Sequence, residues 1–227
     1  MIPLKDDNPI SSRPIVTYFL IGLCVVVFLM QLGSQSYRTG QLFYSYGLIP
    51  SVLMGHDQLP MDIYAIPAYM TIFSSMFMHG GWIHLIGNMW YMKIFADNIE
   101  DNLGARNFII FYILCGIGAA MTQVLMNTHS QVPMVGASGA IGGVLGAYLI
   151  NHPNARVLVL IPYIIITIVK IRALYVLGFW FILQFISSGG GIAYAAHIGG
   201  FVSGMILILF FNKRVRRKRK IIKGPWS

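Results

Sequence analysis

Long apolar stretches recur along this chain, and they constrain its fold more than any other feature. They cover residues 15–32, 82–96, 107–126, 139–150, 157–169, 173–187 and 194–211. Charged residues make up only 10% of the sequence, whereas a soluble domain carries about 25%. A helix that crosses a bilayer needs roughly 20 apolar residues, with about 17 as the lower end. The sequence therefore predicts an all-α, polytopic membrane protein.

One apolar stretch is too short to cross. Residues 157–169 are interrupted by Pro162 and flanked by Arg156 and Lys170. As a helix they would rise about 20 Å, less than the roughly 30 Å of the hydrocarbon core. We interpret this stretch as an interfacial or re-entrant cytoplasmic segment. The remaining stretches, with their flanks, predict a bundle of six spans at residues 15–32, 82–99, 107–126, 138–152, 173–187 and 194–212.

The distribution of basic residues predicts the orientation. Eight of the 16 basic residues lie within Lys213–Lys223, directly after the last apolar stretch. Under the positive-inside rule an even number of spans puts both termini in the cytoplasm. We expect a cytoplasmic segment at 1–14, a membrane domain at 15–212 and a basic tail at 213–227 of a multi-pass cell-membrane protein. Behind a spanning helix, such a tail favours anionic lipid over nucleic acid as its partner.

The composition argues against disulfides, metals and cofactors. Cys24 and Cys115 both lie inside apolar stretches, where a disulfide framework of the secreted type is not expected. His79 and His84 lack a nearby Glu or Cys that would complete a zinc site. We therefore expect no metal and no cofactor.

Four polar side chains are expected at one depth in the membrane. Ser138 begins the fourth span, His197 lies about one turn into the sixth, and His84 and Asn88 lie early in the second. These spans run in the same direction, so all four side chains fall within about 10 Å of the outer ends of their helices. Polar groups in a membrane are costly, and such a layer indicates a functional site.

Glycines flank this layer at helical spacing. Gly139 and Gly143 follow Ser138, and Gly200 and Gly204 follow His197. Small residues four apart let helix backbones approach closely in lipid. They would either bring the fourth and sixth spans together or form a homo-oligomer, and the sequence leaves both open.

The residue types in the polar layer suit nucleophilic catalysis. A hydroxyl within about 3 Å of an imidazole is an activated nucleophile. No acidic residue follows Asp101, so Ser138 and His197 would form a dyad rather than a triad. His84, Asn88 and the backbone N–H of Ser138 would donate hydrogen bonds to an oxyanion.

These residues resemble the motifs of the rhomboid family of intramembrane serine proteases. The matching segments are Gly136-Ala137-Ser138-Gly139, Ala196-His197 with Gly200 and Gly204, and His84-Leu85-Ile86-Gly87-Asn88. Glu100, Gly104 and Phe108 resemble the family's turn after the second span.

The resemblance implies a set of roles for this chain. Ser138 would be the nucleophile, His197 the general base and acid, and His84 and Asn88 oxyanion donors. Span 173–187 would be a lateral gate, and Gly189-Gly190-Gly191 part of a cap. The substrates would be proteins with a single transmembrane helix.

One position departs from the family pattern. The family often has an aromatic residue four positions after the serine, where this chain has Gly142. Tyr194 or Phe201 would have to support the ring of His197 instead.

Two other interpretations remain open. A serine between small residues in a membrane helix often serves only packing. The chain would then be a polytopic binding or transport protein, or a non-cleaving, client-binding relative of the proteases.

Overall fold

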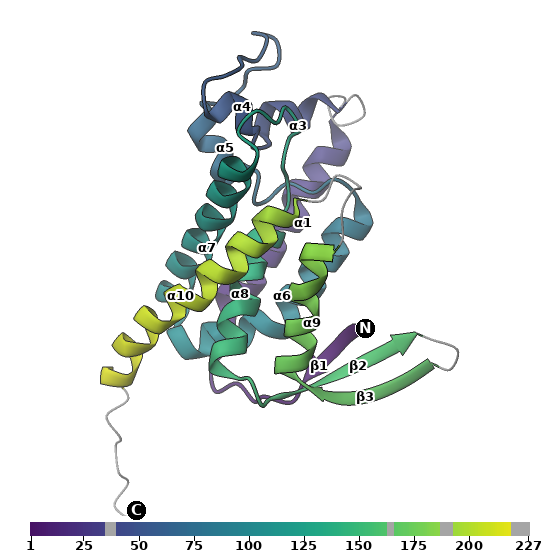
Figure 1. Ribbon diagram of the computed structural model, residues 1–227, viewed down its shortest axis with the longest axis vertical. Coiled ribbons are helices and arrows are strands. Elements are labelled where there is room, and N and C mark those ends of the chain that lie inside the picture. The colour runs from purple at the N-terminus through teal and green to yellow at the C-terminus, as the bar shows by residue number, and fades with distance from the viewer. Residues whose placement is uncertain (35–39, 163–165, 187–192, 219–227) are drawn as a thin grey trace, which may run out of the picture.

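The structure is a computed structural model that describes residues 1–34, 40–162, 166–186 and 193–218. Its longer helices form a bundle, with a small sheet at one end and short helices at the other (Figure 1). In chain order the elements are β1 (Ile2–Asp6), α1 (Ile15–Gly33), α3 (Gln41–Tyr46), α4 (Pro50–Leu53), η1 (Ala68–Met70), α5 (Thr71–Ser74), α6 (Trp82–Leu103), α7 (Ala105–Met126), α8 (Ser138–Asn151), β2 (Arg156–Pro162), β3 (Ile166–Arg172), α9 (Ala173–Ile186) and α10 (Tyr194–Lys218).

Helices occupy the positions of all the expected spans, and the protein is a mostly helical membrane protein. Among the described residues, three helices are long and apolar enough to cross a membrane: Ile15–Gly33, Ala105–Met126 and Tyr194–Phe211. Ser138–Asn151 and Ala173–Ile186 are apolar but shorter. α6 has 22 residues and carries Lys93 and several acids in its second half, which lowers its hydropathy. The expectation of six membrane crossings thus stays a prediction.

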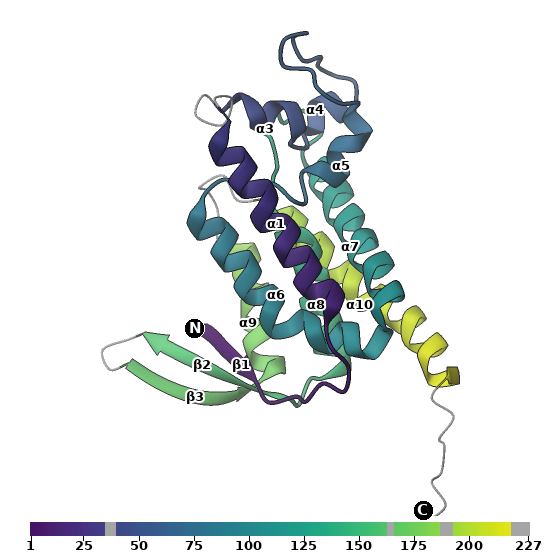
Figure 2. The same cartoon turned by 180° about the vertical axis from the view of Figure 1, so that it is seen from behind.

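α8 lies at the centre of the bundle. It packs against α6, α7, α9 and α10, and every residue from Gly139 to Tyr148 is buried. α10 crosses α7 and α8 on one side in Figure 1, and α1 lies over α6 on the opposite side in Figure 2. A helix that is covered on all sides can be short and still hold a fixed position, because its packing rather than its length sets that position.

Glycines let α8 and α10 approach to backbone contact. A Cβ atom at Gly200 would overlap the carbonyl of Gly139, and one at Gly204 would overlap the carbonyl of Gly143. The four glycines expected to mediate packing thus lie at a crossing within one chain. That crossing brings the first turn of α8 beside the first turns of α10.

The expectation of an all-α fold is wrong at one end of the bundle. Residues 157–162 and 166–169 are not helical but belong to β2 and β3, which pair as an antiparallel hairpin. The expected interfacial or re-entrant position of this stretch stays a prediction. β1, from the expected cytoplasmic segment, pairs with β2, and Ile2 lies opposite Leu160. The stretch is rich in Val and Ile, which favour strands. Because a hairpin returns to the side from which it left, it does not change the number of membrane crossings.

A buried carboxylate joins α1 to α6. Glu100 accepts hydrogen bonds from the backbone N–H groups of Val16 at 2.9 Å and Thr17 at 2.7 Å. These are among the first N–H groups of α1, which have no partner within the helix. The chain then turns at Gly104, with a φ of 75°, and α7 begins. The residues that resemble the family's turn thus hold α1, α6 and α7 together.

The last helix extends into the expected basic tail. α10 continues to Lys218, beyond the expected start of the tail at residue 213. The segment 219–227 and the expected cap at Gly189-Gly190-Gly191 lie outside the described residues.

Candidate active site

Ser138 and His197 lie within hydrogen-bond distance of each other. The Oγ of Ser138, the first residue of α8, is 2.8 Å from the Nε2 of His197 on α10. The two residues are 59 positions apart in the chain, and the glycine crossing of α8 and α10 brings them together. Because Ser138 begins its helix, its backbone N–H has no partner within the helix.

The pair opens into a large cavity within the bundle. The cavity has a volume of about 880 Å³ and is lined by residues of α6, α7, α8, α9 and α10 and of the loop before α8. All four predicted site residues line it: His84, Asn88, Ser138 and His197. Its volume lies within the range of about 300–1,000 Å³ that is typical of ligand-binding clefts.

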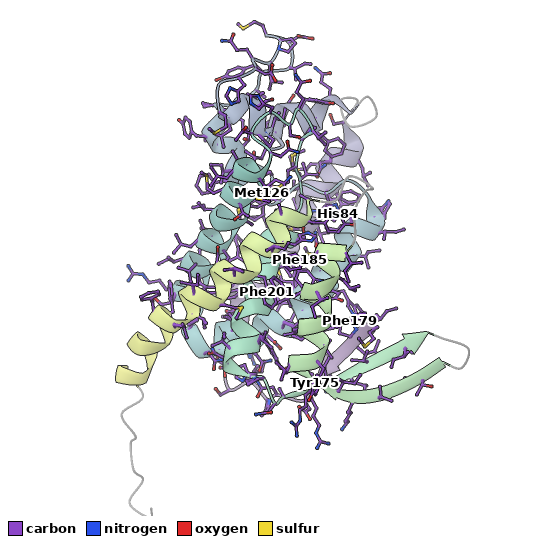
Figure 3. All side chains as sticks on the ribbon, in the orientation of Figure 1. His84, Met126, Tyr175, Phe179, Phe185 and Phe201 are labelled. Carbon is purple, nitrogen blue, oxygen red and sulfur yellow. The ribbon has the colours of Figure 1, made fainter. Side chains whose placement is uncertain are left out.

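His84 points toward the loop that leads into Ser138. Its Nδ1 accepts a hydrogen bond from the backbone N–H of Gly80 at 3.4 Å, so its Nε2 carries the proton when the ring is neutral. That Nε2 lies against Gly136, where a Cβ atom would come within 2.6 Å of it. Gly136 also has a φ of 128°, which favours glycine. Figure 3 shows His84 at the end of the bundle opposite the sheet.

Asn88 presents a hydrogen-bond donor without a partner. Its Nδ2 is buried and makes no hydrogen bond with the part of the chain that the structure describes. Asn88 is 8% exposed and lines the cavity one turn after His84. A buried amide donor that lacks a partner costs free energy, which a ligand oxygen in the cavity would recover.

Sequence reasoning missed the residues that hold the ring of His197. Gln184 on α9 places its Oε1 at 2.8 Å from the Nδ1 of His197. Trp180, one turn earlier on α9, lies over the same ring with centroids 5.8 Å apart and an angle of 34°. A single amide in the otherwise apolar stretch 173–187 was the available signal.

The two aromatic residues expected to support His197 take different positions. Tyr194 meets the imidazole edge-on at 6.3 Å between centroids. Phe201 stacks on Trp180 at 6.0 Å and on Phe181 at 4.5 Å. Tyr194 thus contacts the ring directly, whereas Phe201 supports it through Trp180.

Neighbouring polar groups fix the loops around the cavity. The backbone N–H and carbonyl of His79 pair with the side-chain amide of Gln31 on α1 at 3.1 and 3.2 Å. The rings of His79 and His84 meet at 5.2 Å between centroids. Gln123 on α7 accepts a hydrogen bond from the N–H of Ala196 at 3.2 Å, and so fixes the first turn of α10.

The described residues contain no group of three or more His, Cys, Asp or Glu side chains that could hold a metal ion. Cys24 and Cys115 are buried and free, on α1 and α7. The polar side chains that line the cavity include the hydroxyls of Ser75 and Ser138, the imidazoles of His84 and His197, and the amide of Asn88.

Comparison with known proteins places the chain in a family. The Rhomboid domain model matches residues 67–214. The chain is 26% identical to Rhomboid protein 1, mitochondrial, of Saccharomyces cerevisiae over 90% of this chain and 56% of that protein. It is 27% identical to Rhomboid protease GluP of Bacillus subtilis over 86% of this chain and 34% of that protein.

A third relative matches over most of its own length. The chain is 31% identical to Putative rhomboid protease YdcA of Bacillus subtilis over 66% of this chain and 71% of that protein. The chain spans about half of the yeast relative and about a third of GluP. Since the domain match covers more than half of the sequence, the chain belongs to the rhomboid family.

Proposed function

We propose that this protein is a serine endopeptidase that hydrolyses peptide bonds in or near the transmembrane helices of other membrane proteins. The observation that carries the proposal is the distance of 2.8 Å between Ser138 Oγ and His197 Nε2, beside a cavity inside a bundle of apolar helices. A hydroxyl that donates to a neutral imidazole is the arrangement of an activated nucleophile. The relatives that are named as proteases support it further.

The chemistry follows from the donors and acceptors around the cavity. Ser138 Oγ attacks the scissile carbonyl carbon while its proton passes to His197 Nε2. The oxyanion accepts hydrogen bonds from Asn88, His84 and the Ser138 N–H. As the intermediate collapses, His197 gives the proton to the leaving amine. His197 then takes a proton from water, which attacks the acyl-enzyme and releases the second product.

The orientation of the chain in the membrane determines how substrates reach the site. We infer that the chain crosses the membrane six times with both termini in the cytoplasm, because the basic residues then lie inside. The end of the bundle that carries the polar layer would then face the side of the membrane away from the cytoplasm. Substrates would enter from the lipid, so the partners are transmembrane proteins and the bilayer. The proposal requires no cofactor and no nucleic acid.

Cleavage of a reporter substrate tests the proposal. The purified full chain in proteoliposomes is incubated with a reporter that carries one transmembrane helix. We expect cleavage that is lost in Ser138→Ala and in His197→Ala. Ser203→Ala is the matched control, because Ser203 lies on α10 against Gly118 and away from the cavity. Full cleavage by Ser138→Ala would refute the proposed nucleophile.

A covalent probe separates the protease from a binding or transport protein. A fluorophosphonate reacts with an activated serine and needs no knowledge of the natural substrate. We expect labelling of the wild type and the Ser203→Ala variant, and none of Ser138→Ala. A wild type that neither labels nor cleaves would favour the client-binding alternative.

A further inference from the structure

The hydrogen bonds of His197 leave one arrangement of protons that satisfies every group. A neutral imidazole carries a proton on one ring nitrogen only. To accept the proton of Ser138, His197 must carry its own proton on Nδ1. Nδ1 faces the Oε1 of Gln184 at 2.8 Å, and an amide oxygen accepts but does not donate.

The orientation of the Gln184 amide is itself fixed. Its Nε2 donates a hydrogen bond at 2.8 Å to the backbone carbonyl of Trp180, four residues earlier on α9. A backbone carbonyl only accepts, so the NH2 of Gln184 has to face it. A flipped amide would set an oxygen against that carbonyl and an NH2 against Nδ1. The carbonyl of α9 thus determines which atom of Gln184 meets His197.

α9 holds the ring in place as well as its proton. The indole of Trp180 lies over the imidazole at 5.8 Å between centroids. Gln184 is only 9% exposed, so water does not compete freely for its hydrogen bonds. The other groups that face His197 are Ser138 of α8, Tyr194 of its own helix and, across the cavity, His84 of α6.

We propose that Gln184 is a positioning residue that holds His197 in the tautomer able to accept the Ser138 proton. This inference rests on the proposed protease function. Gln184 would select the tautomer of His197, as the carboxylate does in a triad, but it would carry no charge. The sequence has no acid after Asp101 that could take this role from the nearby helices. In a triad, a wrong tautomer lowers kcat by about 10⁴-fold.

Two substitutions at Gln184 and one control test the proposal. Gln184→Leu keeps the size of the side chain but removes the acceptor. Gln184→Glu keeps an acceptor for Nδ1–H, whether the carboxyl is ionised or protonated. Ile182→Val is the control, because Ile182 lies on the exposed side of the same helix. We expect Gln184→Leu to lower kcat at least about 30-fold with KM changed less than about twofold, since the lost interaction serves the transition state.

A spectroscopic readout separates positioning from a merely structural role. In protein with ¹⁵N-labelled histidine, we expect the nitrogen signals of His197 to report the Nδ1–H form, and to shift toward a mixture in Gln184→Leu. The signals of His197 are identified by their absence in His197→Ala. We expect Gln184→Glu to restore both the Nδ1–H form and cleavage to within about fivefold of wild type.

The outcomes are distinguishable. Cleavage by Gln184→Leu within about twofold of an active wild type, or an unchanged tautomer, would overturn the role of Gln184 and leave the protease intact. If Gln184→Leu does not fold, failure of Gln184→Glu to keep the Nδ1–H form overturns it equally. A wild type that neither cleaves nor labels would refute the proposed protease function. The tautomer of His197 would still test whether its contact with Gln184 holds the Nδ1–H form.

Discussion

Replacing Gly139 with alanine should separate the catalytic pair without touching either of its side chains. A Cβ atom at Gly139 would lie 2.6 Å from the Cβ of Ala119 on α7. Carbon atoms in contact lie about 3.5–4.0 Å apart, so α8 must move by roughly 1 Å at this point. Ala119 has no rotamer by which to withdraw. Because Ser138 is the neighbouring residue, its Oγ would move by a similar amount from the 2.8 Å contact with His197.

We expect Gly139→Ala to lower kcat for the reporter substrate by about 10²-fold, as a misplacement of about 1 Å costs in other enzymes. The free energy of unfolding should fall by about 1–3 kcal/mol, the usual cost of overpacking. The matched control is Gly22→Ala on α1, where an added Cβ meets nothing within 4 Å. The double variant Gly139→Ala/Ala119→Gly should recover activity, because the clash is then removed. Near-normal cleavage by Gly139→Ala, or no recovery in the double variant, would refute the reasoning.

Three further predictions follow from other contacts. Glu100→Ala leaves two buried N–H groups of α1 without their acceptor, and should lower the free energy of unfolding by about 3 kcal/mol, measured by thermal unfolding in detergent against Glu100→Gln, which keeps one acceptor. Burial raises the pKa of Asp6, so the folded chain keeps the carboxyl proton to a higher pH than the unfolded chain. The resulting stabilisation of the fold is present below about pH 4 and is lost as the pH rises through the raised pKa. Asp6→Asn should therefore flatten the pH dependence of Tm in this range. Gly136→Ala would place a Cβ within 2.6 Å of His84 Nε2 at a φ of 128°. It should lower kcat and leave fluorophosphonate labelling less affected. An unchanged kcat would show that His84 has no part in binding the oxyanion.

Local composition predicted the helices well and the sheet not at all. The expected span 15–32 is α1 at Ile15–Gly33, and 107–126 is α7 at Ala105–Met126. An apolar stretch is a local signal, and at these two helices its ends lie within two residues of the helix ends. The pairing of Ile2 with Leu160 joins segments that are far apart in the chain. Length alone excluded 157–169 as a spanning helix but did not distinguish a strand from an interfacial segment.

The candidate site was predicted in part because depth follows from chain direction. Ser138, His197, His84 and Asn88 were expected in one layer, and all line one cavity. Which residues of α9 face the site depends on how that helix is rotated about its own axis, and a largely apolar stretch does not reveal this rotation. Gln184 was nevertheless visible as the amide of that stretch, and a polar group in a membrane helix indicates a partner.

The same close packing that joins Ser138 to His197 moves the support of the imidazole to α9. At Gly142 a Cβ would already lie 3.0 Å from the carbonyl of His197, so no aromatic side chain fits between α8 and α10. The aromatic support comes from Trp180 of α9 instead, whose ring would lie 3.7 Å from the same Cβ and 5.8 Å, between centroids, from the imidazole. α9 would therefore be both the expected lateral gate and the support of the proposed general base, His197.

This double role makes a prediction that a simple gate does not. Phe181 on α9 stacks on Phe201 of α10 at 4.5 Å between centroids, and Phe181→Ala should loosen α9 against the bundle. If α9 only controlled entry, looser packing would raise the rate of cleavage. Because α9 also orients the imidazole, we expect kcat to fall at least about tenfold, together with fluorophosphonate labelling. Phe179→Ala, on the exposed side of α9, should change neither, and faster cleavage by Phe181→Ala would show that the base does not depend on α9.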